Sequence, residues 1–396
     1  MSSTSSAPSR AMPAALLLLT VLVVAATLRA SITSVGPVLG LLSADTGLGE
    51  SQLGLLGALP LIAFAVVSPL VHVVSQRFGP ERTVLVALVV LTGATVLRSV
   101  AGWDGWLWVG TAIIGAAIAV GNVLLPSLVK RDFPGRTART TGIYSAVLSA
   151  FAAIASGVAL PIGEAFGWRI AVGCWALLAL VGAIIWAPRA LRATTLPEPQ
   201  PSTAGRSMWT SATAWHVALF MGTQSTTFYL LVNWLPTIEV GMGVAPLVAG
   251  LHLFLFQVVG ILAGLAVPLL MRERGDLRAV AAGCTALMLA AMLGLLLAPA
   301  VPLLWVAVAG ASSGATLVIA LTFIAQRARS TADAGRLSGM VQSVGYLLAT
   351  LGPIGAGVLL ELTGAWQSAV VAVAVVAVLQ ILTSLLAGRD RFTHPA

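Results

Sequence analysis

Long apolar segments separated by short polar connections extend along most of the chain. A transmembrane α-helix needs about 20 consecutive, mainly apolar residues, and the pattern predicts twelve such helices. The predicted spans cover 13–38, 53–74, 83–101, 106–129, 138–161, 169–188, 212–236, 246–271, 278–299, 302–326, 336–360 and 366–387. The sequence therefore predicts an all-α membrane protein, with a kink in the eleventh span where Gly352-Pro353 interrupts the helical pattern.

A polar stretch interrupts this pattern near the middle of the chain. It covers 189–211 and contains Pro-Glu-Pro-Gln-Pro-Ser-Thr-Ala-Gly at 197–205. Proline and small polar residues favour an extended linker over a helix. We therefore predict an N-terminal six-helix bundle over 1–188, a cytoplasmic linker over 189–211 and a C-terminal six-helix bundle over 212–396.

The two predicted bundles carry similar glycines at a constant spacing. Gly142 lies at the start of the fifth span and Gly339 at the start of the eleventh, while Gly167 and Gly364 follow the ends of these spans. The members of each pair are 197 residues apart. Two pseudo-symmetric halves in tandem are typical of transporters that bind their substrate between the halves, near the middle of the bilayer.

The composition agrees with a protein embedded in the lipid bilayer. Hydrophobic residues make up 58% of the 396 residues and charged residues only 9%, whereas soluble domains carry roughly a quarter charged residues. The mean hydropathy is +1.00. We expect a monomeric, multi-pass protein of a bacterial inner (plasma) membrane.

The positive charge has a simple explanation in the predicted topology. A net charge of +8 and a pI near 10.9 would suggest a nucleic-acid partner for a soluble protein. With a cytoplasmic N-terminus, however, all Lys and Arg residues except Arg29, Arg98 and Arg169 fall on the cytoplasmic side. The positive-inside rule therefore predicts both termini in the cytoplasm and no nucleic-acid partner.

Arg29 is the single charged residue that the pattern places near the middle of a span. In one interpretation the first helix ends at Leu28 and Arg29 reaches the outer headgroups. In the other, Arg29 lies inside a tilted helix over 13–38 and shares a small, polar face with Thr33. The scarcity of outward arginines favours the buried position, as does the 197-residue offset, which carries Arg29 onto Thr226 in the middle of the seventh span.

No acidic residue lies in the core of any predicted span. The acidic residues away from the cytoplasmic side fall at outer helix ends or in loops, namely Asp45, Glu50, Asp104, Glu164, Glu239 and Glu361. A buried guanidinium without a partner is unstable unless water or a ligand supplies negative charge. Its planar fork suits a carboxylate or another small anion, so Arg29 indicates an anionic substrate.

Several motifs resemble one transporter family. The loop after the second span, Gln76-Arg77-Phe78-Gly79-Pro80-Glu81-Arg82, resembles the signature loop of the major facilitator superfamily. Arg77, Gly79 and Arg82 match it, whereas His72 and Gln76 replace a glycine and an aspartate. The stretches 28–37, 121–134 and 224–236 resemble the cyanate/2-nitroimidazole branch over both halves. The resemblance implies a transporter with the major facilitator fold and a gating loop at Arg77, Gly79 and Arg82.

The resemblance also implies which helices line a central cavity. In this superfamily spans one, four, seven and ten line it, with contributions from two, five, eight and eleven. The polar residues on these spans are the candidates for substrate binding beside Arg29, namely Thr33, Asn122, Gln224, Thr227, Tyr229, Gln342 and Tyr346. For any one of them, a hydrogen bond between helices is the alternative role.

His252, in the outer third of the eighth span, is the one deep group that titrates near physiological pH. It is the candidate for proton coupling, with an ordinary hydrogen-bonded histidine as the alternative. The four histidines and the two cysteines show no metal-ligand spacing, and we expect neither a metal nor a cofactor.

Three possible functions can be compared with these residues. The first is secondary transport of a small, cyanate-like or organic anion by alternating access, with possible coupling to protons. The second is uptake or efflux of neutral drug-like compounds such as nitroimidazoles. The third, a membrane enzyme or a receptor, would need paired carboxylates, a His/Asp set or metal ligands within the spans, and the sequence provides none there.

Overall fold

The computed structural model describes residues 13–100, 103, 105–134, 136–192, 207–271, 276–329 and 331–393. These residues form helices and connections without any strand. The first half contains α1 (Ala14–Thr33), η1 (Gly36–Val38), α2 (Leu39–Thr46), α3 (Glu50–Phe78), α4 (Pro80–Arg98), α5 (Gly105–Asp132), α6 (Thr137–Phe166), α7 (Trp168–Gly173) and α8 (Trp175–Arg192). The second contains η2 (Met208–Thr210), α9 (Ala212–Gly241), α10 (Pro246–Ala266), α11 (Pro268–Met271), α12 (Arg278–Leu297), α13 (Pro302–Gln326), α14 (Thr331–Ala349), α15 (Leu351–Thr363) and α16 (Trp366–Ala387).

Eleven helical segments of the described chain are long and apolar enough to cross a membrane. The long helix α9 is not among them, because polar residues such as Gln224, Ser225 and Asn233 lie within it. The all-α membrane fold is therefore confirmed, and the predicted count of twelve fits once α9 is included. The predicted linker begins later than expected because α8 continues to Arg192, and 193–206, like Asp104, lie outside the described residues.

Four of the predicted spans are broken rather than continuous; the sixth divides at Cys174 into α7 and α8, and the eighth at Val267 into α10 and α11. The first ends as α1 at Thr33, passes through η1 at Gly36-Pro37 and continues as α2 to Thr46. The eleventh is divided at Thr350 into α14 and α15, as the kink expected at Pro353 requires. Proline has no N–H and clashes with the carbonyl four residues earlier, so Pro37 and Pro353 favour the interruptions of the first and eleventh spans.

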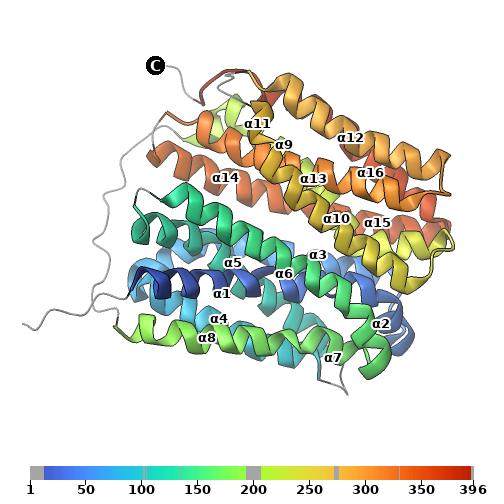
Figure 1. Ribbon diagram of the computed structural model, residues 1–396, viewed down its shortest axis with the longest axis horizontal. Coiled ribbons are helices and arrows are strands. Elements are labelled where there is room, and N and C mark those ends of the chain that lie inside the picture. Colours follow the sequence, from blue (N-terminus) through green and yellow to red (C-terminus); the bar gives the residue numbers. More distant parts are fainter. Residues whose placement is uncertain are drawn as a thin grey trace, which may run out of the picture.

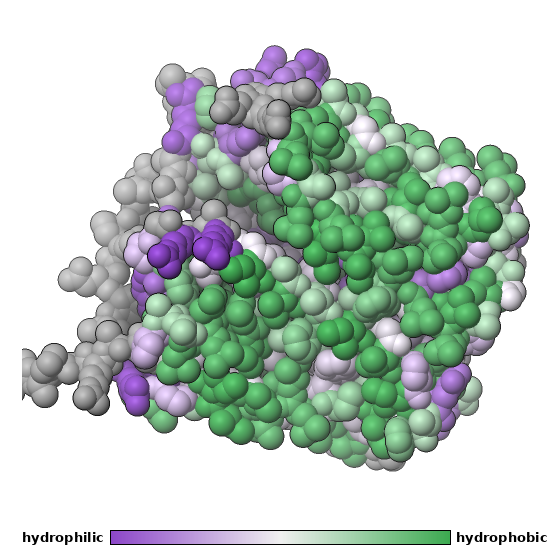
Figure 2. Space-filling view, viewed as in Figure 1, coloured by the Kyte–Doolittle hydropathy of each residue, from purple (hydrophilic) through white to green (hydrophobic). Residues whose placement is uncertain are grey.

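The helices lie side by side in one bundle (Figure 1). The helices α1 to α8, here the N-half, form its lower part, and α9 to α16, the C-half, form its upper part. The start of α1 and the end of α16 lie at the same end of the bundle, as an even number of spans requires. Apolar side chains cover the flank of the bundle (Figure 2), where lipid tails would contact it.

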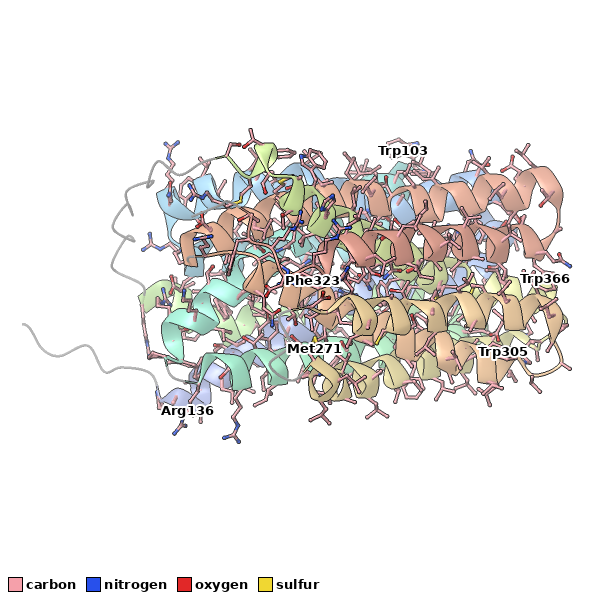
Figure 3. All side chains as sticks on the ribbon, turned by 90° about the horizontal axis from the view of Figure 1, so that it is seen from above. Trp103, Arg136, Met271, Trp305, Phe323 and Trp366 are labelled. Atoms are coloured by element: carbon pink, nitrogen blue, oxygen red, sulfur yellow. The ribbon has the colours of Figure 1, made fainter. Side chains whose placement is uncertain are left out.

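The two ends of the bundle differ in chemistry. Arg136 lies at the end where α1 begins, here called the basic end, and Trp305 and Trp366 lie at the opposite, aromatic end (Figure 3). Basic residues on the cytoplasmic side and Trp at membrane interfaces are typical of inner-membrane proteins. The prediction that the basic end faces the cytoplasm rests on this pattern.

The two halves touch closely at the aromatic end. A β-carbon added at Gly54 would lie 2.4 Å from the backbone oxygen of Pro353, and one added at Gly357 would lie 2.4 Å from that of Glu50. The backbone N–H of Ser51 donates a hydrogen bond of 2.8 Å to Glu361 Oε2 across the halves. Figure 2 shows the surface hollowed between the halves toward the basic end. The molecule is thus closed at the aromatic end.

Candidate substrate-binding site between the halves

Arg29 lies one turn from the end of α1 and faces the C-half. Its guanidinium carbon lies 5.0 Å from the ring centre of Phe228 and 5.9 Å from that of Tyr229, both on α9. Arg29 is half-buried, and none of the described residues forms a hydrogen bond or an ion pair with its guanidinium group. The side chain is therefore directed between the halves rather than toward the lipid headgroups. It carries a charge that aromatic faces stabilise only in part.

An aromatic cluster lies beside this charge, and two of its rings, Phe228 and Tyr229, contact the guanidinium. The ring centres of Tyr229 and Tyr346 are 6.5 Å apart, and Phe64 packs edge-on against Tyr346 at 5.1 Å. Phe228 in turn packs edge-on against Tyr229 at 5.1 Å. These four residues, here the aromatic cage, come from α3, α9 and α14 and so from both halves. The cage and Arg29 together form a mostly apolar site with a single positive charge.

Two of the predicted polar residues, Thr33 and Gln224, join helices instead, and a third, Thr227, forms a hydrogen bond within its own helix. The Thr33 hydroxyl donates to the carbonyl of Ala152 on α6 at 2.9 Å, so it joins α1 to α6. Thr227 donates to the carbonyl of Gln224 at 2.8 Å within α9. Gln224 is buried and donates to the carbonyl of Ser313 on α13 at 3.4 Å. The partners of Thr33 and Gln224 are the contacts between helices that the sequence left open as the alternative role.

The two remaining polar candidates, Gln342 and Asn122, form no hydrogen bond to another helix within the described part of the chain. Gln342 is half-buried on α14 and donates to the Ser338 hydroxyl one turn away at 2.9 Å. Asn122 is half-buried on α5. The structure thus brings Arg29, Tyr229 and Tyr346 together. It adds Phe64 and Phe228, which the search for polar residues missed although Phe228 directly precedes Tyr229.

The predicted proton carrier has a partner that the sequence did not reveal. His252 Nδ1 on α10 lies 2.7 Å from Oε1 of Glu239 on α9. Glu239 is 0% exposed, and its other oxygen, Oε2, has no hydrogen-bond partner among the described residues. Glu239 lies near the end of α9, as expected, but its burial was not predicted. Because transmembrane helices tolerate proline, α9 continues past Pro236 to Gly241 and buries the carboxyl group.

The predicted gating loop is the turn between α3 and α4. Gly79 has a φ of +84°, a conformation that glycine adopts without strain. Arg77 and Arg82 are exposed, and the guanidinium of Arg77 lies 5.5 Å from the ring centre of Phe78. This geometry explains the need for glycine, and the gating role of the two arginines stays a prediction.

A buried acid follows this turn directly. Glu81 in the first turn of α4 pairs with Arg131 of α5, and its backbone carbonyl accepts a hydrogen bond of 2.8 Å from the indole N–H of Trp186. Asp132 pairs with Arg189, which is also 3.8 Å from Glu81. We call Glu81, Arg131, Asp132 and Arg189 the basic-end cluster. It ties α4, α5 and α8 together beside this turn.

The comparisons with known proteins agree with this arrangement. Residues 21–349 match the Major Facilitator Superfamily. The chain belongs to this superfamily. It is 39% identical over 377 residues to the 2-nitroimidazole transporter of Escherichia coli (strain K12), covering 94% of this chain and 95% of that protein. It is 25% identical over 350 residues to the cyanate transport protein CynX of the same strain, covering 88% and 91%.

A solved structure has the same fold. It is that of a bacterial homologue of the human lysosomal transporter Spinster, in an inward-facing and occupied conformation. The TM-score is 0.78 at 17% identity, over 99% of this chain and 100% of that one. The predicted family and its resemblance to the cyanate/2-nitroimidazole branch are confirmed. This superfamily member is a multi-pass membrane transporter of the bacterial inner membrane and not an enzyme.

Proposed function

We propose that this transporter carries a small anion by alternating access and that Arg29 binds the anionic group. The observation behind the proposal is the unpaired guanidinium of Arg29 between the halves, 5.0 Å from the Phe228 ring centre. A charge in a low-dielectric site is costly unless a counter-charge is present. A substrate anion that supplies this counter-charge binds where both halves can respond to it.

The geometry around Arg29 favours a small, planar or linear anion. Phe228 and Tyr229 lie against the guanidinium within the range of cation–π contacts. No described residue accepts a hydrogen bond from the guanidinium N–H groups, and these groups match carboxylates and other small anions. The apolar rings of the cage leave few further polar partners for a larger, highly hydroxylated solute.

A neutral nitroaromatic compound is the second candidate, and one observation favours it. A flat ring can stack on the aromatic cage while its nitro oxygens accept hydrogen bonds from Arg29. The 2-nitroimidazole transporter, 39% identical, is named for such a compound. Both candidates accept hydrogen bonds from Arg29. They differ because an anion also neutralises the positive charge of Arg29, whereas a neutral nitroaromatic compound does not.

Coupling to protons would resolve an energetic difficulty of anion uptake. Moving one negative charge inward against an inside-negative potential costs about 2.3 kcal/mol per 100 mV. A proton carried with the anion removes this cost. We assign the proton to the pair of His252 and Glu239, because Glu239 is fully buried and lies 2.7 Å from the imidazole. The pair bridges α9 and α10, and α9 also contributes Phe228 and Tyr229 to the cage.

Uptake into proteoliposomes tests the proposal. We expect cyanate and small carboxylates to be accumulated when the lumen is alkaline, and Arg29→Gln to abolish this uptake. Arg192→Gln, which removes an exposed positive charge at the end of α8, is the matched control and should transport normally. Uptake of 2-nitroimidazole that is independent of the membrane potential, with no uptake of any anion, would favour the second candidate instead.

A further inference from the structure

A second arginine is buried without an acidic partner. Arg98, the last residue of α4, is 2% exposed. Its Nη1 donates to the carbonyl of Ser31 at 2.8 Å and its Nη2 to that of Val172 at 3.2 Å, whereas its Nε has no partner among the described residues. Backbone carbonyls satisfy hydrogen bonds but do not neutralise a full charge. A buried arginine of this kind calls for an anion.

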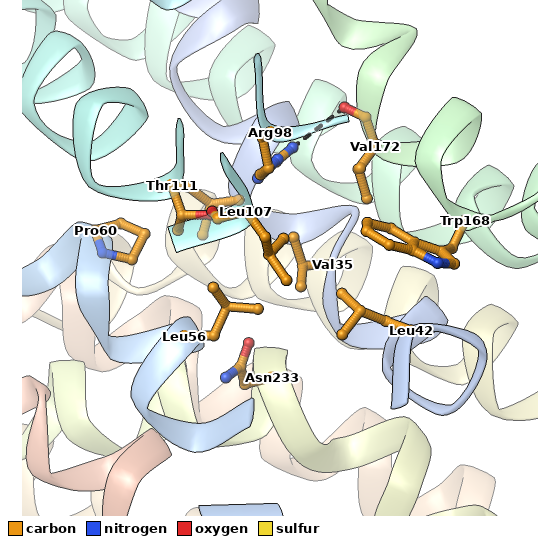
Figure 4. A pocket seen from close by; sticks show the side chains of 12 residues that line it. Val35, Leu42, Leu56, Pro60, Arg98, Leu107, Thr111, Trp168, Val172 and Asn233 are labelled. Atoms are coloured by element: carbon orange, nitrogen blue, oxygen red, sulfur yellow. Dashed lines mark hydrogen bonds between the residues drawn. The ribbon is translucent and has the colours of Figure 1, made fainter. Parts of the chain in front are cut away.

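This arginine lines a small cavity near the aromatic end (Figure 4). The cavity measures about 20 Å³, which exceeds the ~10–15 Å³ that one water molecule needs. Arg98 and Asn233 lie on opposite sides of it, and apolar side chains such as Leu56 and Leu107 form the wall between them. The space accommodates a ligand the size of a single ion and excludes an organic substrate.

The cavity is complete only when the two halves are in contact. Of the residues that line it, Asn233 alone comes from the C-half. Asn233 is 5% exposed, and its Nδ2 has no hydrogen-bond partner among the described residues. A β-carbon added at Gly57 would lie 1.6 Å from this Nδ2, so the amide reaches the cavity through the space that the glycine leaves. An unpaired donor from one half thus faces the cavity that contains an uncompensated cation from the other.

The nearby acid is already paired. Asp45, at the end of α2, accepts a hydrogen bond of 3.0 Å from the indole N–H of Trp168, which also lines the cavity. Asp45 further pairs with Arg169. The charge of this acid is therefore directed to Arg169, and the charge of Arg98 stays without compensation.

We propose that this cavity binds a small monovalent anion such as a halide, held by Arg98 and enclosed by Asn233 when the halves close. A ligand that binds one conformation stabilises that conformation. The anion therefore favours the state closed at the aromatic end, independently of any solute at Arg29. Both chloride from the medium and the transported anion could supply the negative charge at Arg98. The Arg29→Gln variant distinguishes these sources, because it removes the proposed transport site but leaves the cavity at Arg98 intact.

The test is saturable binding of chloride to purified protein, measured with ³⁶Cl⁻ and by thermal unfolding in chloride against gluconate. In the wild type we expect chloride and bromide, but not gluconate, to raise the unfolding temperature with a saturating dose dependence. Asn233→Asp places a carboxylate of the same size opposite Arg98 and should weaken chloride binding about tenfold or more. Arg98→Gln should do the same, and Arg29→Gln should leave it unchanged.

Asn233→Asp also guards against a folding defect. Its added carboxylate lies across the cavity from Arg98 and supplies a negative charge there, so we expect this variant to be at least as stable as the wild type without chloride. Chloride binding that is absent in the wild type, or unchanged in both Arg98→Gln and Asn233→Asp, overturns the proposal. Binding lost in Arg29→Gln but kept in the other two variants assigns the chloride to the transport site and also overturns it.

Discussion

Glycines allow the two halves to approach closely at the aromatic end, and a single added methyl group can perturb this contact. In the structure a β-carbon at Gly357 would lie 2.4 Å from the backbone oxygen of Glu50 and 3.1 Å from the Trp234 ring. Ordinary contacts are about 1 Å longer. Since a backbone oxygen cannot move aside as a flexible side chain can, Gly357→Ala forces α15 away from α3.

The size of the effect follows from the overlap. Overpacking at a close contact costs about 1–3 kcal/mol, and here the cost falls only on the conformation in which α3 and α15 touch. In the alternating-access mechanism that we propose, the open conformation separates these helices and relieves the clash. A difference of this size shifts the equilibrium between the two conformations about 5- to 150-fold toward the open one.

Alkylation of a buried position reports this shift. Leu56 on α3 is 2% exposed in the cavity near Asn233, and we would introduce Leu56→Cys after replacing Cys174 and Cys284 with alanine. Purified protein in nanodiscs is then treated with a bulky maleimide. We expect Gly357→Ala to be labelled at least about fivefold faster.

Gly355 provides the matched control on the same helix. A β-carbon at Gly355 meets no atom within 4 Å, so Gly355→Ala should label at the wild-type rate. Equal labelling of Gly355→Ala and Gly357→Ala, whether fast or slow, would show that the contact between α3 and α15 does not control access to the cavity.

Three further predictions concern the cage, the proton pair and the basic-end cluster. Phe228→Leu removes an aromatic face from Arg29 and should weaken binding of planar aromatic solutes about fivefold, with a smaller effect on cyanate, as competition binding would show. Glu239→Gln should abolish uptake driven by a pH gradient but preserve exchange of substrate for substrate in proteoliposomes; uptake that still follows the gradient would exclude this pair as the proton carrier. Glu81→Gln leaves Arg131 and the buried Arg189 with one acid fewer, so it should destabilise the N-half by about 1–2 kcal/mol, and an unchanged unfolding temperature would contradict the role of the cluster.

The sequence predicted those features that depend on the length and polarity of single segments. The spans follow from apolar stretches long enough to cross a bilayer, and the break before Pro353 follows from the missing N–H of proline. The interior position of Arg29 could also be predicted, because a charge within an apolar run has few stable alternatives.

The contacts between neighbouring helices could not be predicted from the same pattern. Phe64 and Phe228 look like ordinary apolar residues in the sequence, and only the packing of α3, α9 and α14 shows that Phe228 contacts a charge and that Phe64 packs against Tyr346 in the same cluster. Glu239 and Arg98 look like residues at helix ends, but contacts with α10 and with the backbone of α1 bury them. In each case the position along the chain was predictable, whereas the neighbour was not.

The central claim is that Arg29 binds the anionic group of the substrate. Its most direct test is equilibrium binding of cyanate and small carboxylates to purified Arg29→Gln protein, with Arg192→Gln as the control for the loss of one positive charge. We predict that Arg29→Gln folds and unfolds like the wild type but no longer binds any anion that the wild type binds, while Arg192→Gln binds normally. Wild-type affinity for these anions in folded Arg29→Gln protein would contradict the claim.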